Sequence, residues 1–258
     1  MTLWLIPLVF IAAFIAGMMN SVAGGGTLIT FPMLVWLGVD PISANITCAV
    51  SLWPGSLGAM VGFRHELGDS RRWMLLLGAP SVAGGLIGAN LLLLTPSRLF
   101  ASVVPFLILF ATILFAAGER ITRRLTRNTD PGSTVRDPTR SWWVAAILFQ
   151  FVVAIYGGYF GAGMGILMLA ALGLMGLSDI HQMNGLKNFF AVCINIVAAV
   201  YFVAAGRVEW TYVLVMATGA IAGGYGGAGL ARKLGRRFVR RAVVAIGLAM
   251  AVSLLFKG

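Results

Sequence analysis

Two glycine-rich breaks interrupt long apolar segments of this chain, and the residues at these breaks could bind an anion. Residues 20–27 (Asn-Ser-Val-Ala-Gly-Gly-Gly-Thr) interrupt the apolar run 4–37, and residues 157–165 (Gly-Gly-Tyr-Phe-Gly-Ala-Gly-Met-Gly) interrupt the run 142–177. A helix that begins after such a break offers free backbone N–H groups and about half a positive charge at its N-terminus, which favours an anion. Because unpaired peptide groups at membrane depth are tolerated only inside protein or beside a cavity, the paired breaks indicate the binding site of a transporter.

Lys187 is the charged residue expected inside an apolar span, about two turns into the segment that follows the second break. Ionisable residues within a membrane are candidates for function. A lysine near a span end can also extend its ammonium group to the membrane surface, and the sequence leaves both interpretations open. Asn184 and Asn188 lie on the same helical face as Lys187, and Asn45 corresponds to Asn184 in the first half of the chain.

The candidate substrate-binding residues all lie at a break or on the span that follows it. They are Asn20, Ser21, Gly24, Gly25, Gly26, Thr27, Asn45, Thr47, Gly161, Gly163, Gly165, Asn184, Lys187 and Asn188.

Other side chains that could do chemistry are poorly placed for it. All eight carboxylates lie in loops or at span ends, as do His65 and His181, so no nucleophile and base form a pair and we do not expect an enzyme. Cys48 and Cys193 are single cysteines within apolar spans, which argues against a zinc site or a disulfide framework. We expect no metal and no cofactor.

The composition indicates a helical membrane protein. Of 258 residues, 59% are hydrophobic and 10% charged, the mean hydropathy is +0.93, and charge-free runs long enough to cross a bilayer recur along the chain. The net charge of +11 comes from residues between these runs, so it reflects membrane topology and contact with acidic lipid rather than nucleic acid.

A repeat divides the chain into two halves. Residues 83–89 match residues 222–228 at five of seven positions with an offset of 139, and the two breaks have nearly the same offset. We therefore predict a first repeat over 1–117, a solvated linker over 118–140 and a second repeat over 141–258.

The distribution of basic residues predicts how the halves cross the membrane. If each broken segment is a re-entrant hairpin, 15 Lys and Arg residues fall on one side and 3 on the other, whereas full crossings give a poor asymmetry. The predicted fold is all-α, with two inverted repeats, each a broken re-entrant helical hairpin plus three transmembrane helices. Both termini face the periplasm and the linker is cytoplasmic. The predicted elements are a hairpin at 4–38, helices at 42–63, 73–94 and 99–117, a hairpin at 142–177, and helices at 182–205, 210–231 and 240–256.

The motifs together resemble the sulfite exporter TauE/SafE family. The first glycine-rich hairpin is followed by Pro32 and by Gly-Val-Asp-Pro-Ile-Ser-Ala-Asn at 38–45, and the second by His-Gln-Met-Asn-Gly-Leu-Lys-Asn at 181–188. The second hairpin departs from the fullest glycine pattern of that family at Ala162 and Met164. The resemblance implies a multi-pass permease of the bacterial inner membrane for sulfur-containing anions such as sulfite, sulfoacetate or another organosulfonate.

Residues and resemblance together predict a secondary transporter that exports such an anion by alternating access at a midplane site between the hairpin tips. The expected partners are a small anionic substrate, the lipid bilayer and a coupling proton or ion, but not nucleic acid, and a homo-oligomer remains open. Two alternatives also remain open: import of sulfonates or other small organic anions, and a passive anion channel.

Overall fold

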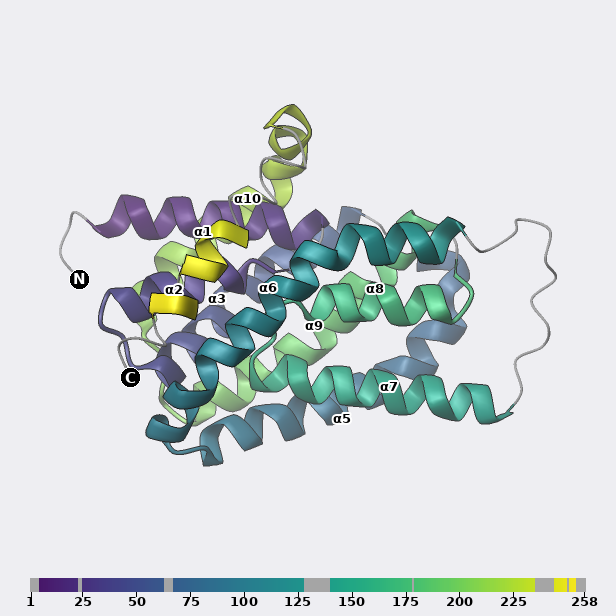
Figure 1. The fold of residues 1–258 in the computed structure, drawn as a ribbon, viewed down its shortest axis with the longest axis horizontal. Coiled ribbons are helices and arrows are strands. Elements are labelled where there is room, and N and C mark those ends of the chain that lie inside the picture. Colours follow the sequence, from purple (N-terminus) through teal and green to yellow (C-terminus); the bar gives the residue numbers. More distant parts are fainter. Residues whose placement is uncertain are drawn as a thin grey trace.

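The computed structural model describes residues 5–22, 25–62, 67–127, 140–177, 179–234, 244–249 and 251–253, and every regular element in these ranges is helical (Figure 1). The first half contains α1 (Leu5–Val22), α2 (Thr27–Trp36), α3 (Pro41–Gly62), the short 3-10 helix η1 (Gly68–Ser70), α5 (Arg71–Leu94) and α6 (Ser97–Arg127). The second half contains α7 (Arg140–Tyr159), α8 (Met164–Leu174), α9 (Ile180–Ala204) and α10 (Trp210–Leu234), followed by helical residues at 244–249 and 251–253. The all-helical prediction is confirmed, and both breaks fall where the glycines predict them.

The helices have the length and polarity of membrane spans. Within the described residues, Arg71–Leu94, Ser97–Gly118, Trp142–Tyr159 and Ile180–Ala204 are long and apolar enough to cross a bilayer. Of the four helices that flank the breaks, Leu5–Asn20, Thr27–Trp36 and Met164–Leu174 are apolar but shorter, whereas the one before the second break, Trp142–Tyr159, is among the long ones. Large side chains on the outer surface, such as Leu75, Val152 and Leu214, are more than 60% exposed. An apolar surface of this extent suits contact with lipid tails rather than water.

Helix α6 is longer than the sequence predicts. It continues to Arg127, ten residues into the segment 118–140 that we expected to be a loop. The residues after Gly118 are mainly good helix formers such as Glu, Arg and Leu, and the next proline is Pro131, so nothing in the local sequence ends the helix at 117. The other helices that are described in full begin and end within three residues of their predicted bounds.

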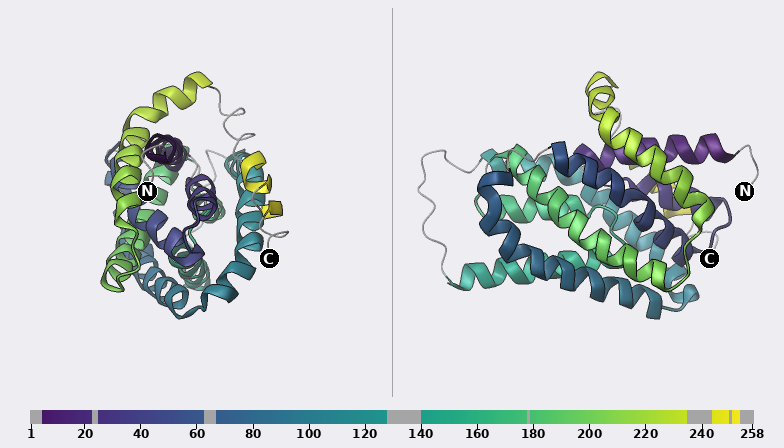
Figure 2. Two further views of the ribbon diagram at one scale, coloured as in Figure 1. Left: turned by 90° about the vertical axis from the view of Figure 1, so that its left-hand side faces the viewer. Right: turned by 180° about the vertical axis from the view of Figure 1, so that it is seen from behind.

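The two halves pack in corresponding ways. Helix α1 lies along α10 and α7 lies along α5, so that the helix before each break packs on a helix of the other half. The long helices α3 and α9 contact each other, and they also pack against α10 and α5 respectively (Figure 2). In Figure 1, α1 begins and α2 ends at the left end of the longest axis, whereas α7 begins and α8 ends at the right.

Glycines make the closest of these helix contacts, because the absence of a side chain lets two helix backbones approach each other. A Cβ atom at Gly88 of α5 would overlap the backbone oxygen of Ile155 in α7, and one at Gly223 of α10 would overlap the backbone oxygen of Phe14 in α1. A side chain at either position would therefore separate the helix before a break from the helix on which it packs.

Candidate functional site

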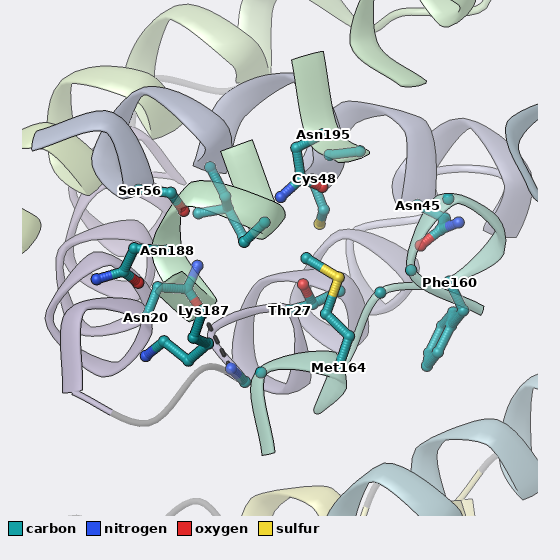
Figure 3. Close-up of a pocket in the computed structure, with 18 residues that line it drawn as sticks. Asn20, Thr27, Asn45, Cys48, Ser56, Phe160, Met164, Lys187, Asn188 and Asn195 are labelled. Carbon is teal, nitrogen blue, oxygen red and sulfur yellow. Dashed lines mark hydrogen bonds between the residues drawn. The ribbon is translucent and has the colours of Figure 1, made fainter. Parts of the chain in front are cut away.

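The two breaks meet at a cavity of about 50 Å³ between the central helices α3 and α9 (Figure 3). A cavity needs only ~10–15 Å³ to hold one water, so this one has room for a solute of a few heavy atoms. The residues around it come from α1, α2, α3, α7, α8, α9 and both breaks, and thus from both halves. They are Asn20, Gly25, Thr27, Asn45, Cys48, Ala49, Leu52, Ser56, Gly157, Gly158, Phe160, Gly161, Met164, Gly165, Lys187, Asn188, Ala191 and Asn195.

The first break is held by the side chain of Asn20. Its Oδ1 accepts hydrogen bonds from the backbone N–H groups of Gly25, at 3.1 Å, and Gly26, at 2.8 Å. Gly25 has a φ of +124°, a conformation that favours glycine. Two of the backbone donors that we expected to hold an anion are therefore occupied by Asn20 in this structure. Because the oxygen of the Asn20 amide is committed to them, its Nδ2 group is left to donate elsewhere.

The second break also depends on glycine. Gly161 and Gly163 have φ values of +75° and +78°, and Gly163 immediately precedes α8. Tyr156 of α7 donates its hydroxyl to the backbone oxygen of Ala162 at 2.6 Å, which ties the turn to the helix before it. The start of α8 is thereby brought to the cavity wall, where Met164 and Gly165 lie, although the N–H groups of Met164 and Ile166 donate to the backbone oxygens of Gly161 and Gly163.

Lys187 lies inside the protein and not at its surface. Its side chain is 1% exposed, and its Nζ has no hydrogen-bond partner among the described residues. The Nδ2 group of Asn188, a residue that is 2% exposed, also has no partner among them. This burial does not fit a lysine whose ammonium extends to the membrane surface. A buried ammonium group without a counter-charge is strongly unfavourable, so the position of Lys187 at the cavity wall is chemically unusual.

The structure brings together most of the predicted binding residues. Those that line the cavity are Asn20, Gly25, Thr27, Asn45, Gly161, Gly165, Lys187 and Asn188. Gly24 and the side chain of Ser21 lie outside the described residues.

Four predicted residues do not line the cavity. Gly26 is packed so closely on α1 that a Cβ atom would lie 2.5 Å from the backbone oxygen of Ala16. Thr47 faces α10 instead, and its hydroxyl accepts a hydrogen bond from the N–H of Glu209 at 3.2 Å. Gly163 lies beside Ala111 of α6, and Asn184 donates its Nδ2 group to the backbone oxygen of Ile180 in its own helix, at 2.8 Å.

The sequence analysis missed Cys48, Ser56 and Asn195, which also line the cavity. A usable signal was present. The cavity residues of α9, at 187, 188, 191 and 195, follow those of α3, at 48, 49, 52 and 56, by the same offset of 139 that relates the glycine motifs. Applying that offset along the whole helical face would have paired Ser56 with Asn195.

Long apolar helices around a polar cavity to which both halves contribute define a multi-pass membrane protein with a buried site. The chain belongs to the TauE/SafE family, because the family model described as "Sulfite exporter TauE/SafE" matches residues 9–254. It is 27% identical over 252 residues to "Probable membrane transporter protein ORF9" of Sinorhizobium sp, covering 97% of this chain and 92% of the relative. It is 26% identical over 257 residues to a "Probable membrane transporter protein" of Haemophilus influenzae, covering 98% and 95%. No solved structure matches. The protein is therefore a membrane transporter and not an enzyme.

Proposed function

We propose that this protein is a secondary transporter that exports a small sulfur-containing anion, such as sulfite, sulfoacetate or another organosulfonate, across the bacterial inner membrane. The observation that carries this proposal is the fully buried Lys187, whose Nζ has no partner among the described residues and which lines a cavity at both breaks. The positive charge of Lys187 requires a counter-anion. The family model that matches this chain is described as a sulfite exporter, and sulfite is such an anion.

The groups around the cavity suit a small oxyanion. Lys187 supplies the counter-charge, and the Nδ2 groups of Asn188 and Asn20 supply neutral donors. The helices α2 and α8 both begin at the cavity, at Thr27 and Met164, and their N-termini add positive potential. Hydrogen bonds to a charged group are stronger than those between neutral groups, so a few such donors can bind an anion specifically.

The packing of the helices supports alternating access between inverted repeats. The first arm of each hairpin packs on the other half, and the hairpins open toward opposite ends of the longest axis (Figure 1). In this proposal both hairpins are re-entrant, their tips lie near the membrane midplane, and rocking of one half against the other exposes the cavity to each side in turn. A coupling proton or ion drives the cycle.

An aromatic cluster supports the position of one membrane boundary. Trp73, Trp142 and Trp143 lie together near the starts of α5 and α7, with ring centroids 4.9–6.2 Å apart. Arg72 lies over the ring of Trp143, with its Cζ 4.9 Å from the centroid. Tryptophan beside arginine is typical of the membrane–water interface, and the basic loops on this side favour the cytoplasm.

The topology can be tested with reporters fused after Gly258. We expect alkaline phosphatase, which matures in the periplasm, to be active there, and green fluorescent protein, which matures in the cytoplasm, to be dark. Fusions within the linker 128–139 provide the matched control and should give the reverse pattern. A fluorescent C-terminal fusion would contradict the re-entrant hairpins and favour full crossings by both broken segments.

The substrate class can be tested by thermal unfolding of the purified protein with a panel of anions. A ligand that binds only the folded state adds RT ln(1 + [L]/Kd), about 2.7 kcal/mol at 100 times Kd. We expect sulfite or a short organosulfonate to raise the melting temperature, and chloride at equal ionic strength to leave it unchanged. If no sulfur-containing anion is stabilising, the substrate assignment is wrong.

The direction and coupling of transport need reconstituted vesicles. A secondary exporter should move the stabilising anion outward against its concentration gradient only when an ion gradient is imposed. Uptake under the same gradient would favour the importer, and flux that follows the anion's own gradient without coupling would favour the channel.

A further inference from the structure

Asn45 fixes the tip of the second hairpin to the central helix of the first half. Its Nδ2 group donates to the backbone oxygen of Tyr159 at 2.8 Å, and its side chain is 3% exposed. Asn45 lies one turn into α3, and Tyr159 is the last residue of α7. The hydrogen bond therefore holds the end of a hairpin arm against a helix 114 residues away in the sequence.

The offset of 139 assigns a counterpart to each partner in this bond. Asn184 of α9 corresponds to Asn45, and Asn20, near the end of α1, corresponds to Tyr159. The corresponding bond, from Asn184 Nδ2 to the backbone oxygen of Asn20, is not formed. Asn184 donates instead to Ile180 in its own helix, at 2.8 Å, and its buried Oδ1 has no partner among the described residues.

The two asparagines thus occupy corresponding positions in different bonding states. A buried amide oxygen without a donor is unfavourable, so the arrangement around Asn184 is not the best that this side chain can make. A buried polar group that finds a partner in only one conformation favours that conformation, and two such groups that favour opposite conformations offset each other, which keeps both conformations accessible to a transport cycle.

We propose that Asn45 and Asn184 are alternating latches. Each holds the tip of one hairpin by a backbone oxygen, that of Tyr159 for Asn45 and that of Asn20 for Asn184, and only one is closed at a time. This inference rests on the alternating access proposed above, and it makes the two asparagines positioning residues rather than ligands of the anion.

The positions of the latches assign each to one end of the molecule. Asn45 is near the start of α3, at the end where α1 begins, and the hairpin that it holds enters from the opposite end (Figures 1 and 2). Asn184 is near the start of α9, at the end where α7 begins. A closed Asn45 latch therefore seals the cavity from the α1 end, which we expect to be periplasmic, and a closed Asn184 latch seals it from the α7 end. The structure has the Asn45 latch closed.

Cys48 allows both ends to be probed without a substrate. It lies on the cavity wall and is 0% exposed, and Cys193→Ala leaves it as the only cysteine. In that background, a membrane-impermeant methanethiosulfonate is applied to one face at a time of oriented membrane vesicles. A net hydrogen bond of ordinary strength shifts a two-state ratio about two- to tenfold. We expect Asn45→Ala to raise the labelling rate of Cys48 from the α1 end by that factor and to lower it from the α7 end. Asn184→Ala should do the reverse.

Asn90→Ala is the matched control, because Asn90 accepts a hydrogen bond from Tyr201 at 2.7 Å and lies at neither hairpin tip. It should leave the ratio of the two rates unchanged, and the double variant Asn45→Ala/Asn184→Ala should return the ratio toward that of the parent. Shifts in the same direction for both single variants, no shift in either, or no labelling of Cys48 from any side would overturn the latch proposal. If the labelling rates shift as expected but no sulfur-containing anion stabilises the protein, the latch proposal stands and the proposed substrate is wrong.

Discussion

Lys187→Met is expected to weaken substrate binding about tenfold to a hundredfold. The substitution keeps the length and the apolar stem of the side chain but removes the only charge on the described cavity wall. A hydrogen bond to a charged group contributes about 1.5–3 kcal/mol, which corresponds to this loss. Affinity would be measured by titration calorimetry with the anion that gives the largest thermal stabilisation.

Two variants separate this role from a general effect of charge. Lys187→Arg should retain part of the affinity, because it keeps the charge but replaces a compact ammonium group with a planar one. Arg207→Met removes a positive charge from an exposed position between α9 and α10 and should bind like the parent. Equal affinity in the parent and in Lys187→Met would exclude the lysine as the counter-charge and leave the two helix N-termini to bind the anion alone.

Valine at either hairpin tip is expected to abolish transport while leaving membrane insertion intact. Gly25 and Gly163 have φ values of +124° and +78°, which a β-branched residue adopts only with strain. At Gly25 a Cβ atom would also lie 3.1 Å from the ring of Phe115. Transport would be measured in reconstituted vesicles, and insertion by the amount of protein extracted from membranes.

Gly78→Val provides the control for the hairpin glycines. Gly78 lies within α5 at an ordinary helical conformation, and a Cβ atom there would be 3.7 Å from Phe189, which is normal contact. Its transport should fall far less than that of the tip variants. If Gly25→Val and Gly163→Val both transport normally, the tips do not shape the site.

Features that depend on local sequence were predictable. The apolar runs and the glycines give the helices and the position of both breaks, because hydropathy and backbone freedom act within a few residues. Lys187 and Asn188 were identifiable for a similar reason, since a polar residue in an apolar span must face the interior. The offset of 139 was also visible in the sequence. It could identify Asn195 as a cavity residue only once it was known that α3 and α9 both line the cavity.

Features that depend on packing between distant segments were not predictable. Thr47 was expected in the site, yet it faces the start of α10, and the rotation of α3 that decides this is set by neighbours in the other half. The backbone donors of Gly25 and Gly26 were expected to be free for an anion, but only the three-dimensional turn brings the Asn20 oxygen to them. The extension of α6 to Arg127 is an exception, because it follows from local helix propensity that the charge pattern of the linker obscured.

The contact between α1 and α10 determines the order in which the protein can be completed. Helix α1 packs on a face of α10 that contains Gly219 and Gly223, and the chain between Val22 and Trp210 must be synthesised before that partner exists. At ~5–20 residues per second, this interval is on the order of 10–40 s. During that time the first segment to leave the ribosome is without its principal neighbour, whereas α7 finds α5 already made. Translation that stops before α10 therefore leaves α1, which contributes Asn20 to the cavity, without the helix on which it packs.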